Sequence, residues 1–335
     1  MKTVVITGSA RGLGFEMAKI FRQNNFNVVI SDLNEEKLDV AKKELKKIKN
    51  SSKVESFVCD VTKAKDIVSL VNFAIEKFNT IDIWVNNAGV NQPDKAIWEL
   101  NEKEIDLVLN VDLKGTIMCS KLVMQEMIKN HSGAIYNVEG YGSNDAKMLG
   151  LSIYGTSKRA ITYFTEALAK ESEEKNTGII VGKLSPGIMI TDFIITALGD
   201  KEKINLSEKT KKVYNILGDY PDVVAKFLVN GMINNTKNNA KIEWLTNKKA
   251  AWRFMTSGFN KRDFFNIKWE VKIMNKKKLY RSKTDKKLCG VCGGIADYFD
   301  IDPTIIRLIW IFLVLCVGTG VLAYFIAALI MPEKD

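Results

Sequence analysis

Short apolar runs alternate with longer amphipathic stretches over the first two-thirds of the chain. The runs have the length of buried strands, and the stretches repeat apolar residues with the period of a helix. Because the alternation lacks hairpin signals, it predicts an α/β fold with a doubly wound parallel sheet covered on both faces. The predicted strands are residues 4–6, 28–30, 56–58, 81–85, 134–138 and 179–184, and the predicted helices are 13–24, 35–49, 64–78, 102–129 and 154–175.

The pattern changes after residue 195. Residues 196–270 are less regular and end in a run rich in aromatic and basic side chains, so they read as an extension of the first domain. Residues 272–287 carry eight Lys or Arg against one acid, and residues 308–331 carry no charge at all. A bilayer span needs about 20 apolar residues. We therefore predict a domain at 1–270, with its core at 1–195, and a small α-helical membrane module at 271–335 spanning the bilayer at about 308–331.

Composition narrows the chemistry. The 335 residues include one histidine, His131, and five scattered cysteines. A single histidine excludes a catalytic scheme or zinc site built on several imidazoles, and the cysteines are too few for a disulfide scaffold. The formal net charge of +10 suits nucleic acid or an anionic membrane. Clustered lysines before an apolar segment favour lipid, so we expect a membrane lipid partner and no nucleic acid.

A glycine-rich turn follows the first predicted strand and opens the first predicted helix. The segment 7–14 reads Thr-Gly-Ser-Ala-Arg-Gly-Leu-Gly. Such a turn lets the backbone approach a pyrophosphate at the N-terminus of a helix, which predicts a dinucleotide site. The residues of the turn that we expect to bind it are Gly8, Ser9, Arg11, Gly12, Leu13 and Gly14.

Asp32, at the end of the second predicted strand, bears on the choice of coenzyme. Its carboxylate can accept hydrogen bonds from ribose hydroxyls and would repel a 2′-phosphate, so we expect NAD. Arg11 could pair with such a phosphate, which leaves NADP open. A simpler interpretation of Asp32 is a helix cap.

Tyr154 and Lys158 are four residues apart on a predicted helix and therefore share one face. A free tyrosine titrates near pH 10, too high for proton exchange at neutral pH. A neighbouring ammonium stabilises the phenolate, so we expect Lys158 to lower the pKa of Tyr154 and make it a general acid and base. The spacing by itself is more often an ordinary helix surface.

These motifs together resemble the short-chain dehydrogenase/reductase family over residues 1–195. The resemblance rests on the glycine turn, Cys59-Asp60-Val61, Asn86-Asn87-Ala88-Gly89, Asn110, Tyr154-Gly-Thr-Ser-Lys158 and Ser185-Pro-Gly-Ile-Met-Ile-Thr191, in the family's order. It implies a Rossmann fold and hydride transfer between a nicotinamide and a carbonyl or alcohol carbon of a small molecule. It also implies coenzyme contacts at Asp60, Val61, Asn87, Ala88, Gly89, Tyr154, Lys158, Pro186, Gly187 and Thr191, and a water held against Lys158 by Asn110. Many relatives are dimers or tetramers, which leaves a homo-oligomer open.

The serine that polarises the carbonyl in most relatives is displaced. The usual serine positions hold Glu139 and Gly140, and Ser143 is the nearest hydroxyl of that type. The segment resembles the chlorophyll(ide) b reductase branch of the family, which has a Gly-x-Gly-Ser turn at the same offset. On that resemblance we assign Ser143 to the catalytic set with Asn110, Tyr154 and Lys158. Tyr141 remains an alternative, since a phenol can also stabilise an oxyanion.

Residues 276–334 resemble the phage-shock-protein C (PspC) domain, which implies a role in membrane docking or envelope stress. The basic run precedes the apolar segment, so the positive-inside rule predicts a single-pass cell-membrane protein with a cytoplasmic catalytic domain. Gly318-Thr319-Gly320 leaves open a hairpin of two short helices. Cys289 and Cys292 lack the further ligands of a closed zinc site, so we expect no metal.

The whole sequence predicts a membrane-anchored NAD(P)-dependent oxidoreductase acting on a carbonyl or alcohol carbon of an apolar substrate. A first alternative is a membrane-stress or scaffold protein whose dinucleotide fold senses redox state. A second is a fusion of two modules, joined at Val271, that act independently.

Overall fold

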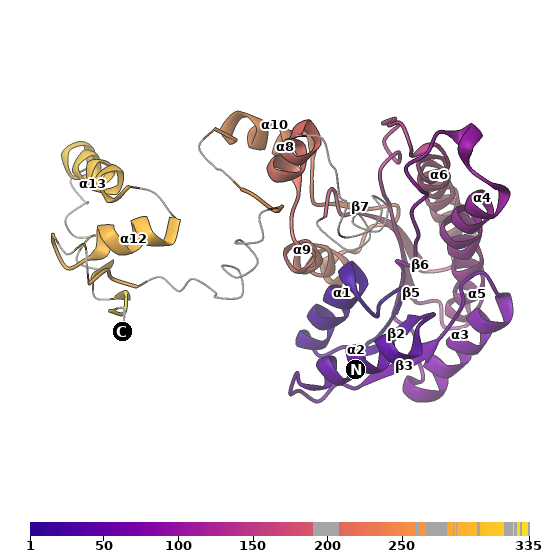
Figure 1. The fold of residues 1–335 in the computed structure, drawn as a ribbon. Coiled ribbons are helices and arrows are strands. Elements are labelled where there is room, and N and C mark those ends of the chain that lie inside the picture. Colours follow the sequence, from indigo (N-terminus) through magenta and orange to yellow (C-terminus); the bar gives the residue numbers. More distant parts are fainter. Residues whose placement is uncertain are drawn as a thin grey trace. The chain divides into compact units, whose positions relative to one another are not determined.

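The computed structural model describes residues 1–189, 208–258, 262–265, 280–283, 285, 287–299, 302–317, 324, 327–328 and 330–333. The chain divides into two compact units, Met1–Arg262 and Asp263–Asp335. In the larger unit, helices cover both faces of one sheet (Figure 1).

The sheet is parallel throughout, with strand order β3-β2-β1-β4-β5-β6-β7. This order confirms the predicted doubly wound α/β sheet. The chain adds strands on one side of β1 as far as β3 and on the other side from β4 onward, so the winding reverses between β1 and β4. Ligands of such sheets bind outside the carboxyl ends of the strands at this reversal. The strands are β1 (Thr3–Thr7), β2 (Asn27–Asp32), β3 (Val54–Val58), β4 (Ile83–Asn86), β5 (Gly133–Val138), β6 (Ile179–Ser185) and β7 (Lys241–Glu243).

Two apolar clusters fill the space between the sheet and its helices. Neighbouring residues of one strand belong to different clusters, as Ile6 and Val5 of β1 do, because successive side chains point to opposite faces. One face packs against α1 (Gly12–Gln23), α2 (Glu35–Lys46) and α9 (Pro221–Asn234). The other packs against α3 (Ala64–Phe78), α5 (Thr116–Ile128) and α6 (Ser152–Glu174). Both faces of the sheet are therefore shielded from water, which explains why the central strands consist of nearly continuous apolar residues.

The predicted helix 102–129 is wrong in one respect. The structure divides it into α4 (Glu102–Val108), a π-helical segment η2 (Leu109–Gly115) and α5, after a short 3₁₀ turn η1 (Ile97–Glu99). Asn101 caps α4 with its side chain, which accepts from the Glu104 N–H at 3.0 Å. π-Helical turns insert a residue into the helical repeat and occur often at functional sites. The insertion changes which side chains of η2 face the sheet.

The extension at 196–270 is more regular than its composition predicts. Its described part contains α8 (Glu208–Leu217), α9, β7 and α10 (Asn247–Thr256). Val224, Ala225, Leu228 and Val229 of α9 are fully buried in the cluster that includes α1. The segment after β6 therefore completes the core of the first unit.

The second unit contains α12 (Val291–Phe299) and α13 (Pro303–Val317). Cys292, Ala296 and Ile306 form its small apolar cluster, and Trp310 and Tyr324 pack against it. The rings of Trp310 and Tyr324 also contact each other edge to face, with their centroids 5.4 Å apart. Among the residues that the structure describes, no helix has both the length and the apolar composition to cross a membrane. Several residues of the predicted span 308–331 lie outside the described ranges, so that span stays a prediction.

Candidate active site

The loops that follow β1, β4 and β5 converge on the N-terminal half of α6. Gly8 packs against Ala88, and Gly89 lies beside the side chains of Asp112 and Lys158. Gly140, after β5, lies against the Tyr154 hydroxyl. The topology thus gathers the predicted motifs at the carboxyl edge of the sheet, where the winding reverses.

The glycine turn has no space for side chains at two positions. A Cβ at Gly8 would lie 2.6 Å from the Ala88 backbone, and one at Gly14 would lie 2.5 Å from the Gly8 carbonyl oxygen. Gly12 differs, because a Cβ there would meet nothing within 4 Å and its φ of +59° disfavours other residues. The open space at Gly12 leaves room for the predicted pyrophosphate.

The start of α1 is open to an anion. Arg11 is the N-cap residue, its side chain does not cap the helix, and the first turn contains no acid. The N–H groups at a helix N-terminus and the dipole there favour negative charge. Leu13 is buried and anchors this turn in the core, and the Ser9 hydroxyl donates to the Ile6 carbonyl at 2.6 Å. These residues fit the phosphates of a dinucleotide.

Asn87 connects the loop after β4 to the glycine turn. Its side-chain amide donates to the carbonyl oxygens of Thr7 (3.0 Å) and Gly8 (2.7 Å). The Thr7 hydroxyl in turn accepts from the backbone N–H groups of Asn87 (3.1 Å) and Ala88 (3.0 Å). The Asn87 side chain therefore fixes the shape of the turn, and Ala88 and Gly89 supply backbone close to it.

Asp32 lies where the ribose of a dinucleotide is expected. Its carboxylate accepts from the N–H groups of Ala10 (3.3 Å) and Leu33 (2.8 Å). The cap of α2 is Asn34, whose side chain accepts from the Lys37 N–H at 2.8 Å. The interpretation of Asp32 as the helix cap is therefore wrong.

Asp60 and Val61 follow β3, next to the end of β2. The Asp60 carboxylate accepts from the N–H (3.0 Å) and the hydroxyl (2.7 Å) of Thr62, which fixes a tight turn. Val61 is buried and contacts Gly115 at the end of η2. Both residues lie close to Asp32 in the sheet, since the Cys59 N–H donates to the Asp32 carbonyl at 3.1 Å.

Tyr154 and Lys158 are both buried on α6, one turn apart. The Lys158 ammonium lies 5.5 Å from the centre of the Tyr154 ring. The start of this helix is capped by a residue that sequence reasoning missed: the Gln92 side-chain oxygen accepts from the N–H groups of Ile153 (2.7 Å) and Tyr154 (3.0 Å). Gln92 comes from the loop after β4 and is itself buried. Nothing in the local sequence marks it as a cap, because it lies 61 and 62 residues from its partners.

A second missed residue is Asp112. The π-helical segment places its fully buried carboxylate 3.0 Å from the Lys158 ammonium, as a buried ion pair. The other carboxylate oxygen accepts from the Val90 N–H at 2.7 Å. Asn110, predicted to act near Lys158, is half-buried in η2, and its side chain makes no hydrogen bond within the described part of the chain. An acid therefore pairs directly with the lysine that is predicted to be catalytic.

The charges of the three groups are coupled. Burial raises the pKa of Asp112, and Lys158 only partly offsets this effect. Burial lowers the pKa of Lys158, but Asp112 and Tyr154 raise it, and the net direction is upward. Burial raises the pKa of Tyr154, Lys158 lowers it, and Asp112 raises it. The expected net lowering of the tyrosine pKa is wrong for this structure, because desolvation and the Asp112 charge outweigh the lysine.

Gly140, one of the two positions predicted to correspond to the usual serine, faces Tyr154. A Cβ at Gly140 would meet the Tyr154 hydroxyl, so a side chain there would face the phenol. The Ser143 hydroxyl instead donates to the Lys158 carbonyl and accepts from the Gly140 N–H, both at 3.2 Å. Tyr141, the alternative, is more exposed, at 37%. Ser143 must rotate away from the helix backbone before it can donate to a substrate oxygen.

The loop after β6 is only partly described. Pro186 and Gly187 follow the last residue of the strand, and Gly187 has a φ of +73° and packs against Leu245. Thr191, predicted to contact the nicotinamide carboxamide, lies outside the described residues.

Comparison with protein families matches both units. The family described as short chain dehydrogenase matches residues 2–201, and the PspC domain matches residues 277–334. The chain belongs to the short-chain dehydrogenase family. Members bind NAD(H) or NADP(H), and the open glycine turn of this chain fits either dinucleotide.

Curated relatives include enzymes of the chlorophyll(ide) b reductase branch. This short-chain dehydrogenase is 30% identical to a probable chloroplastic chlorophyll(ide) b reductase of Arabidopsis thaliana, over 79% of the chain and 55% of the relative. It is 32% identical to a chloroplastic chlorophyll(ide) b reductase of Oryza sativa subsp. japonica, over 76% and 74%. The chain spans about half the length of the first of these relatives. A diacetyl reductase of Staphylococcus epidermidis is 34% identical over 57% of the chain and 73% of the relative.

Solved structures of the family share the fold. Levodione reductase matches 75% of this chain and 98% of its own at a TM-score of 0.66 and 22% identity. A xylitol dehydrogenase bound to NAD⁺ matches 72% and 96% at a TM-score of 0.64 and 21% identity. At this identity the likeness concerns the arrangement of the strands and helices.

Proposed function

We propose that this short-chain dehydrogenase transfers hydride between a nicotinamide dinucleotide and a carbonyl or alcohol carbon, with Tyr154 as the acid and base. The observation that carries the proposal is the buried group of Tyr154, Lys158 and Asp112 beside Gly89, in the loop that packs on the glycine turn. A buried phenol one helical turn from an ammonium can hold or release a proton at its oxygen. The bound dinucleotide supplies or accepts the hydride.

The residues around Tyr154 have separate parts in this scheme. Gln92 fixes the first turn of α6 and with it the phenol. Asp112 keeps Lys158 charged in surroundings that would otherwise favour the neutral amine. Lys158 then attracts negative charge that develops on the Tyr154 oxygen as its proton moves to the substrate. Ser143, or alternatively Tyr141, donates a hydrogen bond to the substrate oxygen. Asn110, in the same π-helical segment as Asp112, holds a water against Lys158.

The remaining predicted contacts serve the dinucleotide. We propose phosphate binding at Gly8, Ser9, Arg11, Gly12, Leu13 and Gly14, adenosine contacts at Asp32, Asp60 and Val61, and nicotinamide-side contacts at Asn87, Ala88, Gly89, Pro186, Gly187 and Thr191. The Asp32 carboxylate favours NAD over NADP, because it would repel a 2′-phosphate.

Apolar side chains near the start of α6 support an apolar substrate. Leu149 (95% exposed) lies in the loop that enters α6, and Trp98 (84% exposed) lies in η1. The two loops meet where Gly150 packs against Asp94. Large apolar groups exposed together are typical of a binding surface. We therefore propose a substrate whose carbonyl carries a bulky apolar substituent, as the likeness to chlorophyll(ide) b reductases also suggests.

The PspC domain supports attachment to a membrane. We propose that the uncharged segment 308–331 enters the bilayer and that the basic run at 272–287 stays on the cytoplasmic side with the first unit. The lipid partner is then the bilayer itself.

Replacing Tyr154 with phenylalanine tests the enzymatic proposal. The Tyr154→Phe chain should lose turnover by about 10²-fold or more, because it lacks the transferable proton, and should still bind coenzyme. The measurement is kcat/KM on a panel of aldehydes and ketones with NADH and NADPH in parallel, together with coenzyme fluorescence titration. Unchanged turnover would contradict the role of Tyr154.

A second function is favoured by one observation. Glycine occupies the position beside the Tyr154 hydroxyl, and the Ser143 hydroxyl is engaged by the helix backbone. A redox-sensing membrane-stress protein would need the dinucleotide site and no carbonyl-polarising group. Coenzyme binding without turnover on any carbonyl of the panel would favour this function.

A further inference from the structure

Helix α10 has its polar and apolar sides reversed. Helices at the surface of a soluble unit normally bury the apolar face and expose the charged one. Arg253 of α10 points inward instead, and its guanidinium contacts the Asp219 carboxylate at 2.6 Å and the Leu217 carbonyl at 3.0 Å. The Lys249 ammonium lies over the ring of Trp244. The inner face of α10 is therefore cationic and bonded to its own unit.

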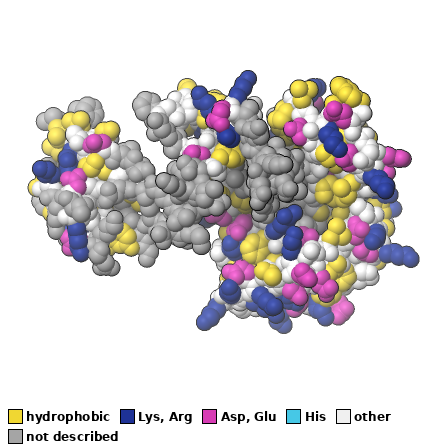
Figure 2. Space-filling view, in the orientation of Figure 1, with side chains coloured by type: hydrophobic (Ala, Val, Ile, Leu, Met, Phe, Trp, Pro, Cys, Tyr) yellow, Lys and Arg dark blue, Asp and Glu magenta, His cyan; other side chains and the backbone are white. Residues whose placement is uncertain are grey.

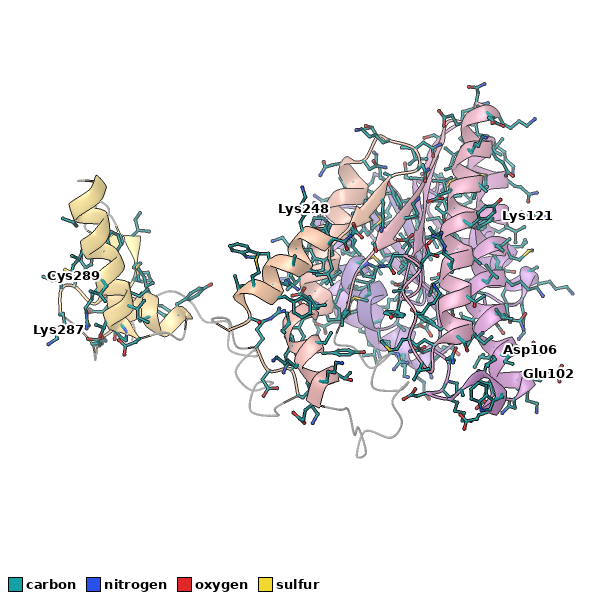
Figure 3. All side chains as sticks on the ribbon, turned by 90° about the horizontal axis from the view of Figure 1, so that it is seen from above. Glu102, Asp106, Lys121, Lys248, Lys287 and Cys289 are labelled. Atoms are coloured by element: carbon teal, nitrogen blue, oxygen red, sulfur yellow. The ribbon has the colours of Figure 1, made fainter. Side chains whose placement is uncertain are left out.

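The outer face of α10 carries large apolar side chains. Trp252 is 63% exposed, Met255 70% and Phe254 48%, and the helix has no buried residue. Trp252 and Met255 are three residues apart and therefore share one side of the helix. Lys248 lies on the same side, one turn before Trp252 (Figure 3). α10 packs beside α8 (Figure 1), and that contact leaves this side uncovered. Two large apolar groups exposed on one side of a ten-residue helix form a surface that a partner is expected to cover.

The outer side of α10 contains a cation and no acid. Between Trp244 and Arg262 the sequence contains five Lys or Arg residues and no acid, but Arg253 and Arg262 pair with Asp219 and Lys249 lies over Trp244, which leaves the exposed Lys248 beside Trp252. Elsewhere on the first unit, in the view of Figure 2, acidic and basic side chains are interspersed. A tryptophan flanked by lysines is typical of a helix that lies in the interface of a membrane, with the ring among the headgroups and the cations beside anionic lipid.

We propose that α10 docks the first unit onto an anionic lipid surface, with Trp252 and Met255 inserted at headgroup depth. The chain itself supports lipid as the occupant, since the PspC domain begins at residue 277, a short stretch after α10 ends at Thr256. A second copy fits less well, because a two-fold interface at this side would bring Lys248 of both copies together. The proposal rests on the membrane attachment proposed above and adds a second point of contact.

Lipid-borne quenching of one tryptophan tests the proposal. The full chain is reconstituted in vesicles of phosphatidylcholine with phosphatidylglycerol, with and without brominated acyl chains. The emission lost in the Trp252→Phe variant reports Trp252 alone, and Trp98→Phe serves as the matched control because Trp98 is exposed on η1. We expect brominated lipid, and not aqueous iodide, to quench the Trp252 component, whereas the Trp98 component should behave in the opposite way.

Three other results would overturn the proposal. Trp252 emission that iodide quenches and brominated lipid does not would show that α10 faces water. Emission shielded from both quenchers, with shielding that grows with protein concentration, would identify a second copy as the occupant. Equal quenching in vesicles of phosphatidylcholine alone would remove the role of the cations. Sedimentation of the chain with the vesicles is measured in the same samples, so a failure of membrane attachment itself is distinguished from a failure at α10.

Discussion

Asp112 gives this short-chain dehydrogenase an acidic group under the proposed catalytic lysine. Both partners are buried, so the pair is protected from salt and solvent. Breaking a buried pair by removing one partner costs about 3–5 kcal/mol, since the other charge is left without compensation. The lysine can avoid that cost only by releasing its proton.

The Asp112→Asn variant should therefore lose activity as the pH rises. Asparagine retains an acceptor for the Val90 N–H but removes the charge, so burial lowers the pKa of Lys158. Lys158 then stays charged only at lower pH, so the alkaline limb of the kcat/KM profile should move to lower pH. At pH values above that limb, kcat/KM should fall by up to about 10²-fold. The measurement is the pH profile of kcat/KM for both chains.

Asp106→Asn provides the matched control, because Asp106 is an exposed acid of α4 (Figure 3). Its profile should coincide with that of the unchanged chain. A uniform loss of rate at every pH in Asp112→Asn would mean that Asp112 acts only through packing.

Sequence reasoning found Tyr154 and Lys158 and predicted Asn110, but it missed Asp112. The two residues are two positions apart, about 200° around a regular helix, so a regular helical pattern that turns Asn110 toward α6 does not also indicate Asp112. The π-helical segment brings Asp112 to Lys158, and no residue pattern in 102–129 marks that segment. The sequence predicted a long helix there, and the structure interrupts it.

At the scale of elements, the N-terminus of α6 depends on a side chain from another loop. Leu151 precedes the helix and cannot cap it, so the first N–H groups rely on Gln92. Unsatisfied donors at a buried helix end are costly. The position of the phenol is therefore coupled to the loop after β4.

Replacing Gln92 with alanine should loosen the first turn of α6. Two buried N–H groups would lose their acceptor, which lowers the free energy of unfolding by about 1–3 kcal/mol. We expect faster hydrogen exchange at the Tyr154 amide and a lower kcat, measured by mass spectrometry and steady-state kinetics. Gln92→Glu, which keeps the acceptor, should restore slow exchange.

Asn101→Ala is the control for a lost cap. Asn101 caps α4 and is exposed, so its loss should cost about 1 kcal/mol without changing exchange at Tyr154. Slow exchange at Tyr154 in Gln92→Ala would contradict the capping role.

Strands were predicted more completely than the elements after β6. β1, β2, β4, β5 and β6 each contain an apolar run typical of a strand covered on both faces, whereas β3 at the edge of the sheet reads Val-Glu-Ser-Phe-Val and is mostly half-buried. β7 is Lys-Ile-Glu, three residues with no such run, and it pairs only at the edge of the sheet through β6. α10 was missed for a related reason, since its reversed faces do not give the pattern of a surface helix.

For the whole molecule, the described candidate site residues all belong to the first unit. A chain that ends at Asn275 should therefore keep its kcat/KM on a water-soluble aldehyde or ketone. It should also be released from membranes by alkaline carbonate, whereas the full chain should stay in the pellet. A large loss of kcat/KM in the shortened chain would mean that the second unit contributes to the site.

The packing of α9 on α1 has a consequence for recombination of this gene. The segment that the family model matches ends at residue 201. Helix α9 lies beyond it and packs on α1 with fully buried side chains. A truncated domain that ended at residue 201 would expose the apolar surface of α1 that α9 covers. Such a domain would aggregate or be degraded. The smallest transferable domain must therefore extend past Glu243, so that it includes both α9 and β7.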